Sequence, residues 1–390
     1  MRTRPFGLLF PDPCSVGFEY APPFALAKGG ALCYNTPAPG GFLAPACYNT
    51  APMNDLTKPF KRLPVALIGT GSYVPEQRLT NYDLEKMVDT SNEWIVERTG
   101  IEERRIAAPD EKTSDMATHA ARKAMESAGV TAEEIDLIIV GTVTPDTFTP
   151  STACYVQANI GAVNAAAFDI SAACSSFLYA LKTAVQFIGC GQAKTALIIS
   201  SEKLSHIVNW EDRSTCVLFG DGAGAAVLRK GTGIEGDSAI LASDIGSDGT
   251  LTDLLLVPGG GSAIPTTEEN IHEKLYTLAM RGNEVFRHAV AHMKDSALSL
   301  IERTGIKPEE IALVIPHQAN LRIINAVTQR LGIPPEKVFV NLQKYGNTSG
   351  AACAIALDEA VRSGRAKKGD IILMVTFGAG LTWSSAAIRL

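Results

Sequence analysis

The stretch GVTAEEIDLIIVG at residues 129–141 returns in a related form as GIKPEEIALVIPH at residues 305–317. In each copy a glycine is followed by an acidic turn and then by a short apolar run, a pattern that predicts a buried β-strand. The two copies lie 176 positions apart along the chain. A repeat of this length predicts two domain-scale halves, because the repeats of a solenoid are only about 20–45 residues long.

The same spacing of 176 positions aligns two further pairs of segments. The helical pattern FLYALKTAV at 177–185 aligns with CAIALDEAV at 353–361, and the strand pattern TALIIS at 195–200 aligns with IILMVT at 371–376. Apolar strands that alternate with helices imply a mostly parallel or mixed sheet covered on both faces. We therefore expect a layered α/β molecule whose two halves are related by pseudo-twofold symmetry.

We place these halves at residues 59–236 and 237–390, after a first segment of different character at residues 1–58. The first segment is rich in Pro and Gly, contains CYNT twice and keeps neither helical nor strand periodicity. We expect it to be a poorly ordered extension, or the product of a start codon assigned too early, with Met53 as a natural beginning.

Two glycine motifs are similar to nucleotide-binding loops without matching one. Gly69 and Gly71 follow the start of a strand pattern, but Val74 occupies the place of the third glycine of G-x-G-x-x-G and no helix begins there. We interpret this pair as turn residues. The motif GDGAG at 220–224 lies between apolar stretches, and we interpret it as tight packing at a turn rather than as a phosphate loop.

The composition excludes several classes of protein. The chain has 390 residues, of which 46% are hydrophobic and 19% charged, which is enough for a large core or two domains. The net charge of −6 argues against a general nucleic-acid binder, and no apolar run approaches the length of a membrane span. The eight cysteines show no metal-ligand spacing, so we predict no metal site and expect a reducing, cytoplasmic setting.

The repeat also brings three polar side chains to equivalent places. Cys174 follows a predicted strand in the first half, and His317 directly follows a predicted strand in the second half. Asn347 lies three residues before Gly350, which is the counterpart of Cys174 in the repeat. Catalytic groups of α/β halves gather at strand ends and helix starts, so these three side chains would face one central site.

Cys174 stands in ISAACSSFLYAL, where small residues precede a helical pattern. A helix N-terminus lowers the pKa of a thiol through the macrodipole and free N–H groups, so we predict a lowered pKa. Cys174 could instead be a buried structural cysteine, His317 a helix cap and Asn347 a turn residue. Together the three suit acyl transfer through a thioester, followed by attack of a carbon nucleophile, with the His/Asn pair holding an enolate oxygen. Thiol proteases use the same residue types, but their cysteine has a different local sequence.

From about Leu63 to Leu390 the chain resembles the β-ketoacyl-acyl-carrier-protein synthase III family, the initiating condensing enzymes of type II fatty-acid synthesis. The resemblance rests on seven stretches in the family's order: TSNEWIVERTGI (90–101), DISAACSSF (169–177), LFGDGAGAAVL (218–228), GNEVF (282–286), HQANLRI (317–323), GNTS (346–349) and FGAGLTW (377–383). It implies the thiolase fold, a duplicated five-layer α-β-α-β-α architecture.

Carried over position by position, the resemblance implies that Cys174 is the acylated nucleophile. His317 and Asn347 would assist decarboxylation of malonyl and stabilise the enolate. The main-chain N–H groups of Cys174 and Ala379 would form the oxyanion hole. Ala379 replaces the middle one of three glycines common in the family. A main-chain donor survives this change where φ is negative, whereas a positive φ would strain an alanine.

The resemblance further implies a tunnel for coenzyme A. The residues that would form it are Trp94 and Arg213 around the adenine, Arg98 and Arg322 at the phosphates, and Gly282 and Asn320 along the pantetheine. An indole offers a large stacking face, and arginine offers planar charge. Without the resemblance, a partly buried tryptophan and arginines on a solvated face would be the simpler interpretation.

Partners follow from the same resemblance. Phe148 in TPDTFTP matches the position that closes the acyl pocket of the neighbouring subunit, which implies a homodimer. Acyl carrier protein is acidic, so its docking site should be basic. Arg287, Arg322 and Arg330 are the candidates, although each could be an ordinary surface charge.

The expected reaction is a decarboxylative Claisen condensation of an acyl-CoA, with acetyl-CoA as the expected primer, and malonyl-acyl carrier protein. It needs no metal or redox cofactor because loss of CO₂ drives it. One alternative is a condensing enzyme or acyltransferase of secondary metabolism with the same fold and another acceptor. The other is a catalytically silent subunit that binds carrier protein.

Overall fold

The computed structural model describes residues 25–26, 32–33 and 64–390. The chain divides into one unit at Met1–Lys61 and a second at Arg62–Leu390. In the first unit, β1 (Ala25–Leu26) pairs antiparallel with β2 (Leu32–Cys33). Apart from these strands, the predicted extension at residues 1–58 lies outside the described residues.

The second unit contains two larger sheets with the same pattern of strand directions. The five-stranded sheet has the spatial order β3 (Val65–Tyr73), β9 (Gly222–Lys230), β8 (Thr195–Glu202), β6 (Leu137–Gly141) and β7 (Ala166–Ile170). The four-stranded sheet has the order β10 (Ala239–Ser247), β15 (Thr382–Arg389), β14 (Ile371–Gly378) and β13 (Ile311–Pro316). In each sheet the first two pairings are antiparallel and the others are parallel.

The repeat seen in the sequence is a repeat of structure. β14 begins and ends 176 positions after β8 begins and ends. The 3-10 turns η1 (Ala132–Glu134) and η6 (Pro308–Glu310), which lead into β6 and β13, differ by the same spacing. Both turns are the acidic segments of the two copies, so the predicted duplication is confirmed.

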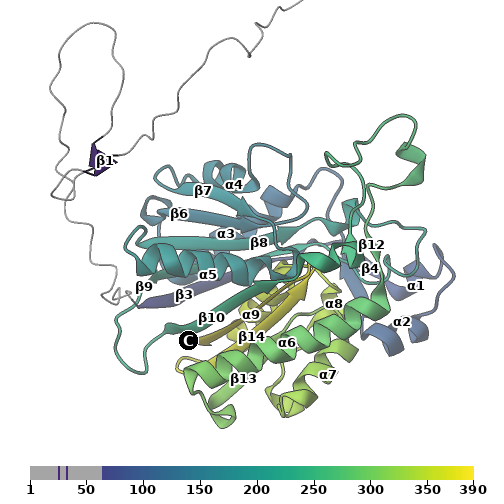
Figure 1. Cartoon of the computed structure of the whole chain (residues 1–390). Coiled ribbons are helices and arrows are strands. Elements are labelled where there is room, and N and C mark those ends of the chain that lie inside the picture. Colours follow the sequence, from purple (N-terminus) through teal and green to yellow (C-terminus); the bar gives the residue numbers. More distant parts are fainter. Residues whose placement is uncertain (1–24, 27–31, 34–63) are drawn as a thin grey trace, which may run out of the picture. The chain divides into compact units, whose positions relative to one another are not determined.

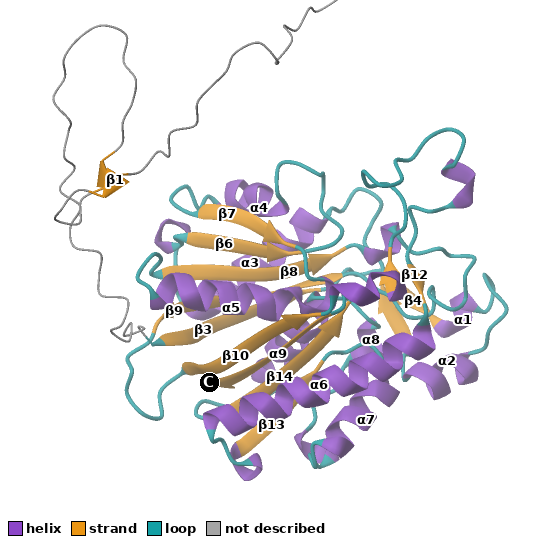
Figure 2. Ribbon diagram, in the orientation of Figure 1, coloured by secondary structure: helices purple, strands orange, loops and turns teal. Residues whose placement is uncertain are grey.

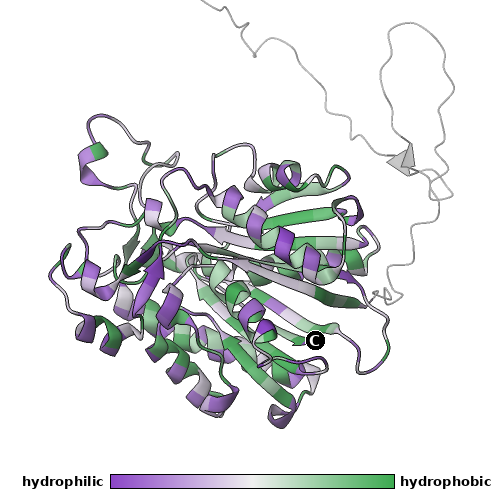
Figure 3. Ribbon diagram, turned by 180° about the vertical axis from the view of Figure 1, so that it is seen from behind, coloured by the Kyte–Doolittle hydropathy of each residue, from purple (hydrophilic) through white to green (hydrophobic). Residues whose placement is uncertain are grey.

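Five layers result from packing these sheets with helices (Figures 1 and 2). The sheets enclose α5 (Ser176–Gly189) and α9 (Ala351–Arg362) in a shared apolar core that includes Phe177, Leu181 and Leu357. The outer layers are α3 (Thr113–Ala128) with α4 (Thr152–Ile160) on the five-stranded sheet, and α6 (Gly282–Thr304) with α7 (Leu321–Arg330) on the four-stranded sheet. Figure 3 shows hydrophobic residues concentrated along the strands and hydrophilic residues on the outer helices. The predicted α-β-α-β-α architecture is confirmed.

The predicted turn at Gly69 and Gly71 was wrong, because both residues lie inside β3. A Cβ atom on Gly69 would stand 2.6 Å from the main-chain oxygen of Ala124 and from the Cβ of Ala128, both in α3. The missing side chains therefore allow a helix to pack directly against the strand. In GDGAG, Gly224 similarly faces Ala354, so tight packing was predicted correctly, although this glycine lies in β9 rather than in a turn.

The remaining elements gather beside the strand ends that hold the candidate site. A fourth apolar cluster includes Ile95, Leu204, Phe219 and Leu342 and anchors these elements to the main body. The short strands are β4 (Arg78–Thr80), β5 (Glu103–Arg105), β11 (Leu255–Leu256) and β12 (Ala279–Met280). The helices are α1 (Asn81–Leu84), α2 (Asn92–Thr99) and α8 (Leu342–Tyr345), with 3-10 turns η2 (Ala173–Ser175), η3 (Leu204–His206), η4 (Gly249–Leu254), η5 (Ile271–Glu273) and η7 (Pro335–Lys337). No helix in the described part of the chain is long and apolar enough to cross a membrane.

Candidate active site

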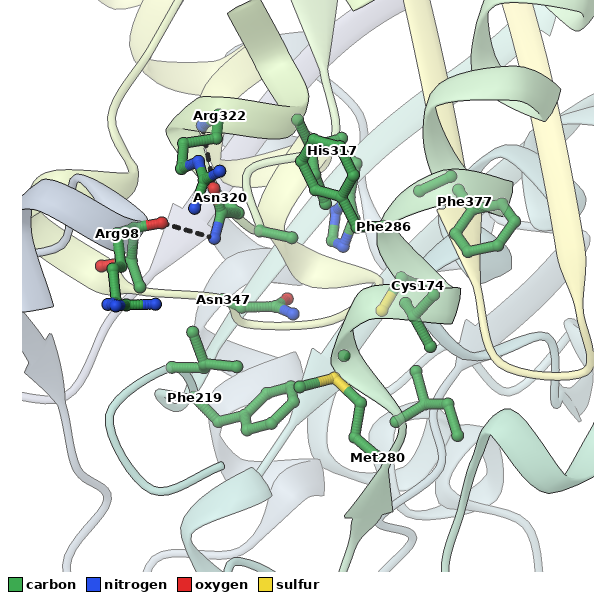
Figure 4. Close-up of a pocket in the computed structure, with 18 of the residues that line it drawn as sticks. Arg98, Cys174, Phe219, Met280, Phe286, His317, Asn320, Arg322, Asn347 and Phe377 are labelled. Atoms are coloured by element: carbon green, nitrogen blue, oxygen red, sulfur yellow. Dashed lines mark hydrogen bonds between the residues drawn. The ribbon is translucent and has the colours of Figure 1, made fainter. Parts of the chain in front are cut away.

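A cavity of about 400 Å³ opens where the two halves meet (Figure 4). Its wall includes apolar side chains such as Phe219, Met280, Phe286 and Phe377. The residues predicted from the sequence that line it are Trp94, Arg98, Cys174, Gly282, His317, Asn320, Arg322 and Asn347. Segments that are far apart in the sequence therefore contribute to one cavity.

Cys174 is held at the start of a helix. It lies in η2, directly before α5, and is 6% exposed. The residue before it, Ala173, has φ = 46°, a left-handed conformation that is uncommon for a residue other than glycine. Burial raises the pKa of the Cys174 thiol to about 12, although side-chain hydrogen bonds with Ser349 and Asn347 act in the opposite direction. The predicted position at a helix start is correct, but the predicted lowering of the pKa was wrong, because burial dominates.

His317 directly follows β13, and its main-chain N–H donates to the oxygen of Val375 over 2.8 Å. This hydrogen bond continues the pairing of β13 with β14, so the histidine is held by the edge of a rigid sheet. Its side chain is buried, and Nδ1 has no hydrogen-bond partner among the described residues. Burial lowers the pKa of His317 to about 4, so the imidazole is neutral near pH 7.

Asn347 lies between α8 and α9 and is fixed through its main chain. Its N–H donates to the oxygen of Leu218 over 2.8 Å, and its oxygen accepts from the N–H of Gly220 over 3.1 Å. Its side-chain Oδ1 accepts from the N–H of Ser349 over 2.8 Å, so Nδ2 is the group that can donate toward Cys174 and the cavity. Figure 4 shows Asn347, His317 and Cys174 converging on the same space from separate segments.

The segment that was expected to supply a second oxyanion donor packs directly on Cys174. A Cβ atom on Gly378 would stand 2.6 Å from the main-chain nitrogen of Cys174. In the described part of the chain, the only residues other than glycine with a positive φ are Ala173, Lys274 and Ser349, so Ala379 carries no such strain. The hydroxyl of Thr382 donates to the oxygens of Ala172 (2.9 Å) and Ala379 (3.1 Å), which ties the two segments together.

Two arginines lie close to the ring of Trp94, a residue of α2 that lines the cavity. The Arg98 guanidinium carbon lies 4.8 Å from the centre of the Trp94 ring, and that of Arg213 lies 5.1 Å from it. Arg213 also donates to the oxygen of Asp89 over 2.6 Å and does not line the cavity itself. The structure therefore brings Trp94, Arg98 and Arg213 together, and their roles toward coenzyme A stay predictions.

Asn320 joins the second half to this region. As the N-cap of α7, it accepts from the N–H of Arg322 through Oδ1 over 2.8 Å. Its Nδ2 donates to the oxygen of Arg98 over 3.0 Å, and both hydrogen bonds are drawn in Figure 4. Gly282, the first residue of α6, lines the same cavity. The side chain of Asn320 is therefore a structural cap as well as part of the wall.

The other predicted residues lie outside the cavity. Phe148, between β6 and α4, is 93% exposed. Arg287 and Arg330 line a second pocket together with Phe286 and Lys294, and Phe286 also lines the main cavity. The two pockets are therefore neighbours, and basic side chains line the second one.

Sequence reasoning missed two polar residues at the site. Glu202 ends the fully buried strand β8, and Ser349 belongs to the motif GNTS but received no role. Both affect the thiol: the side chain of Ser349 lowers the pKa of Cys174, and the negative charge of Glu202 raises it. An acidic residue at the end of an apolar strand pattern was the one available signal for Glu202.

Comparisons with known proteins agree with this geometry. Residues 168–249 match the family 3-oxoacyl-[acyl-carrier-protein (ACP)] synthase III, and residues 301–390 match its C-terminal model. A Caldanaerobacter subterraneus subsp. tengcongensis protein named beta-ketoacyl-[acyl-carrier-protein] synthase III is 55% identical over 329 residues, which cover 84% of this chain and 98% of that protein.

Solved structures give the same result. The crystal structure of 3-oxoacyl-[acyl-carrier-protein] synthase III from Aquifex aeolicus VF5 has a TM-score of 0.77 and 51% identity, covering 84% of this chain and 100% of that one. The priming beta-ketosynthase from the R1128 polyketide biosynthetic pathway has a TM-score of 0.77 at 37% identity, covering 85% of this chain and 98% of that one.

Proposed function

Because the chain belongs to the 3-oxoacyl-[acyl-carrier-protein] synthase III family, we propose that it condenses an acyl-CoA primer with malonyl-acyl carrier protein and so initiates fatty-acid synthesis. The products are a 3-oxoacyl-acyl carrier protein, CoA and CO₂. Acetyl-CoA is the proposed primer. The observation that carries the residue assignment is the convergence of Cys174, His317 and Asn347 on one cavity from equivalent regions of a duplicated fold.

The first half of the reaction is transfer of the acyl group to Cys174. The thiol attacks the thioester carbonyl of acyl-CoA, CoA leaves and an acyl-enzyme remains. The main-chain N–H groups of Cys174 and Ala379 stabilise the negative oxygen of the tetrahedral intermediate. The close packing of Gly378 on Cys174 supports this role, because it brings the two segments together.

The second half of the reaction is decarboxylation and carbon–carbon bond formation. Malonyl loses CO₂, and its enolate attacks the carbonyl of the acyl-enzyme. His317 and Asn347 hold the developing enolate oxygen by donating hydrogen bonds to it. A neutral imidazole and the Nδ2 amide group of Asn347 are the donors that this role requires. Loss of CO₂ drives the condensation, so the proposed mechanism needs no cofactor.

Two observations support further proposals about partners. Phe148 is a large apolar side chain that is 93% exposed in the single chain, as expected if a second copy covers it in a homodimer. Arg287 and Arg330, with Arg322 at the cavity, form a basic region suited to an acidic carrier protein.

Two proposals concern the chain as a whole. The division at residue 236 falls between β9 and β10, consistent with halves at 59–236 and 237–390. A cytoplasmic location suits the free thiols, which are Cys154, Cys174, Cys190, Cys216 and Cys353.

Mixing the protein with a panel of acyl-CoAs is expected to add one acyl group to the Cys174 peptide, because a thioester nucleophile retains its acyl group until malonyl arrives. Intact mass spectrometry with peptide mapping measures the adduct, and the preferred chain length identifies the primer. Native mass spectrometry of the same sample reports whether the protein is a dimer. Absence of an adduct from every acyl-CoA would rule out a CoA-primed reaction and favour a carrier-loaded relative or a silent subunit.

Substitution Trp94→Ala is expected to raise KM for acyl-CoA about tenfold or more with little change in kcat, because aromatic stacking on a base contributes about 1–3 kcal/mol. Steady-state kinetics with each substrate varied in turn measures the effect. Arg330→Glu serves as the matched comparison and should raise KM for malonyl-acyl carrier protein instead. Equal effects of both variants on both substrates would contradict the assignment of separate sites.

The alternative from secondary metabolism is represented by the R1128 priming beta-ketosynthase, at 37% identity. It shares the fold, so identity alone does not distinguish the acceptor. Turnover with malonyl-acyl carrier protein of fatty-acid synthesis, compared with other acceptors, decides between the two. The silent-subunit alternative has less support, because Cys174, His317 and Asn347 are all present in the cavity.

A further inference from the structure

A buried carboxyl group that the reaction described above does not use lies beside the cavity. Glu202 ends β8 and has no exposed surface. Its Oε2 accepts hydrogen bonds from the hydroxyl of Thr142 (3.2 Å), the N–H of Val143 (3.1 Å) and the hydroxyl of Thr144 (2.8 Å). Its Oε1 is buried and has no hydrogen-bond partner among the described residues. A buried oxygen without a partner is costly, so its retention calls for a reason.

The hydroxyl of Ser349 lies between this carboxyl group and the thiol of Cys174, and it interacts with both. Ser349 is held in place in an unusual way. Its φ of 52° is in the left-handed region, and its N–H donates to Oδ1 of Asn347 over 2.8 Å. Strained residues of this kind cluster at functional sites. A hydroxyl has one proton to donate and lone pairs to accept, so Ser349 can accept from one neighbour while it donates to the other.

We propose that Glu202 accepts the proton of the Cys174 thiol through the hydroxyl of Ser349 as the thiol attacks the acyl-CoA thioester. This inference rests on the proposed function. The S–H bond of Cys174 breaks and its proton joins Oγ of Ser349, while the proton of Ser349 moves to Oε1 of Glu202. The Cys174 sulfur uses the freed electron pair to form the new thioester.

The protons balance over a full cycle. CoA leaves as a thiolate and takes a proton from water, which is the one proton that the overall condensation consumes. When the 3-oxoacyl product departs, the Cys174 sulfur leaves as a thiolate. It regains its proton from Ser349, which in turn regains one from Glu202. Glu202 is then ionised again and ready for the next primer.

The electrostatics identify Glu202 as the base that suits this step. Burial raises the pKa of Cys174 to about 12, so the thiol cannot ionise unaided near pH 7. Burial also raises the pKa of Glu202 to about 7 and lowers that of His317 to about 4, so Glu202 is the stronger base of the two. A base with a pKa near the working pH is the most effective general base.

The surroundings of Glu202 leave it as the group that titrates there. The groups that face it are the hydroxyls and N–H described above and, across Ser349, the thiol of Cys174. The neighbouring residue Lys203 directs its ammonium group away, to the main-chain oxygens of Ala108, Pro109 and Glu111. A pH dependence near 7 in the reactivity of Cys174 would therefore report on the carboxyl group.

The test is the pH profile of Cys174 reactivity in the protein and in Glu202→Gln. Glutamine keeps the size and the acceptor oxygen but cannot take up a proton. Alkylation by iodoacetamide, followed on the Cys174 peptide between pH 5.5 and 9 as assay conditions of about this range, should rise through a midpoint near 7 in the unmodified protein. Glu202→Gln should lose this rise and react about 10²-fold more slowly at the upper end. Superimposable profiles would overturn the proposal.

Two further variants keep the test decisive. Ser349→Ala retains the Cβ atom, so it adds no new backbone strain at φ = 52°, and it should lose the same rise. It answers the question even if Glu202→Gln fails to fold. Asp221→Asn is the matched control, because Asp221 is equally buried and its pKa is also raised by burial, but it binds Ala107 and Ser205 instead. Its profile should keep the rise.

Acyl adduct formation with acyl-CoA separates this inference from the proposed function. An adduct that forms equally fast in the unmodified protein and in Glu202→Gln would support the function and overturn the relay. A pH rise in alkylation that Glu202→Gln abolishes, without any adduct from acyl-CoA, would support the relay and overturn the function.

Discussion

Replacing Cys174 by alanine is expected to reduce condensation by more than about 10⁴-fold, because no other group in the cavity can carry the acyl chain. Decarboxylation of malonyl-acyl carrier protein should continue, since His317 and Asn347 still hold the enolate oxygen. The product of the residual reaction is then acetyl-acyl carrier protein. Release of CO₂ and formation of the 3-oxoacyl product, measured in parallel, separate the two steps.

The matched control is Cys216→Ala, because Cys216 is also a buried free thiol but does not line the cavity. This variant should retain both activities. A Cys174→Ala protein that still condenses would show that the acyl group is carried elsewhere. A protein that neither condenses nor decarboxylates before mutation would favour the silent-subunit alternative.

Replacing His317 by alanine is expected to slow the second half of the reaction and to leave the first half, acylation of Cys174, nearly unchanged. Loss of one donor to a developing oxyanion costs about 10²–10³-fold, so decarboxylation and condensation should both fall by at least this factor. Acylation of Cys174 by acyl-CoA should change little, because His317 is assigned to the enolate oxygen of the second half-reaction. A burst of CoA release, followed by slow turnover, is the kinetic signature.

His288→Ala is the control for this experiment, since His288 lies on α6 and does not line the cavity. It should leave both rates unchanged. If His317→Ala abolished the burst of CoA release as well, the histidine would be the acceptor of the thiol proton. The assignment of His317 to the second half-reaction alone would then be wrong.

The architecture was predictable because the determining features are local and repeated. Each half has short apolar runs bounded by acidic turns, and such runs bury themselves in a sheet covered on both faces. The positions of Cys174 and His317 followed from strand ends for the same reason. The arginines near Trp94 needed the family resemblance, because an exposed arginine has no local signal that distinguishes a ligand site from a solvated face.

The errors and omissions have a common origin in packing between distant segments. Gly69 and Gly71 were taken for a turn because the sequence does not show that α3 presses against that strand. The pKa of Cys174 was expected to fall because a helix start is visible in the sequence, whereas the depth of burial is not. Glu202 and Ser349 went unassigned because their effect on the thiol depends on how separate segments of the chain pack together.

Because of the duplication, glycines stand at the positions that mirror three buried side chains of the site region. At the spacing of 176, the twins of Cys174, Glu202 and His317 are Gly350, Gly378 and Gly141. A Cβ atom on Gly378 would meet the nitrogen of Cys174, one on Gly350 would meet the hydroxyl oxygen of Ser200, and one on Gly141 would meet Ser176. Each half therefore supplies a side chain where the other must supply empty space. Two identical copies of either half could not form this site, and the halves cannot be exchanged.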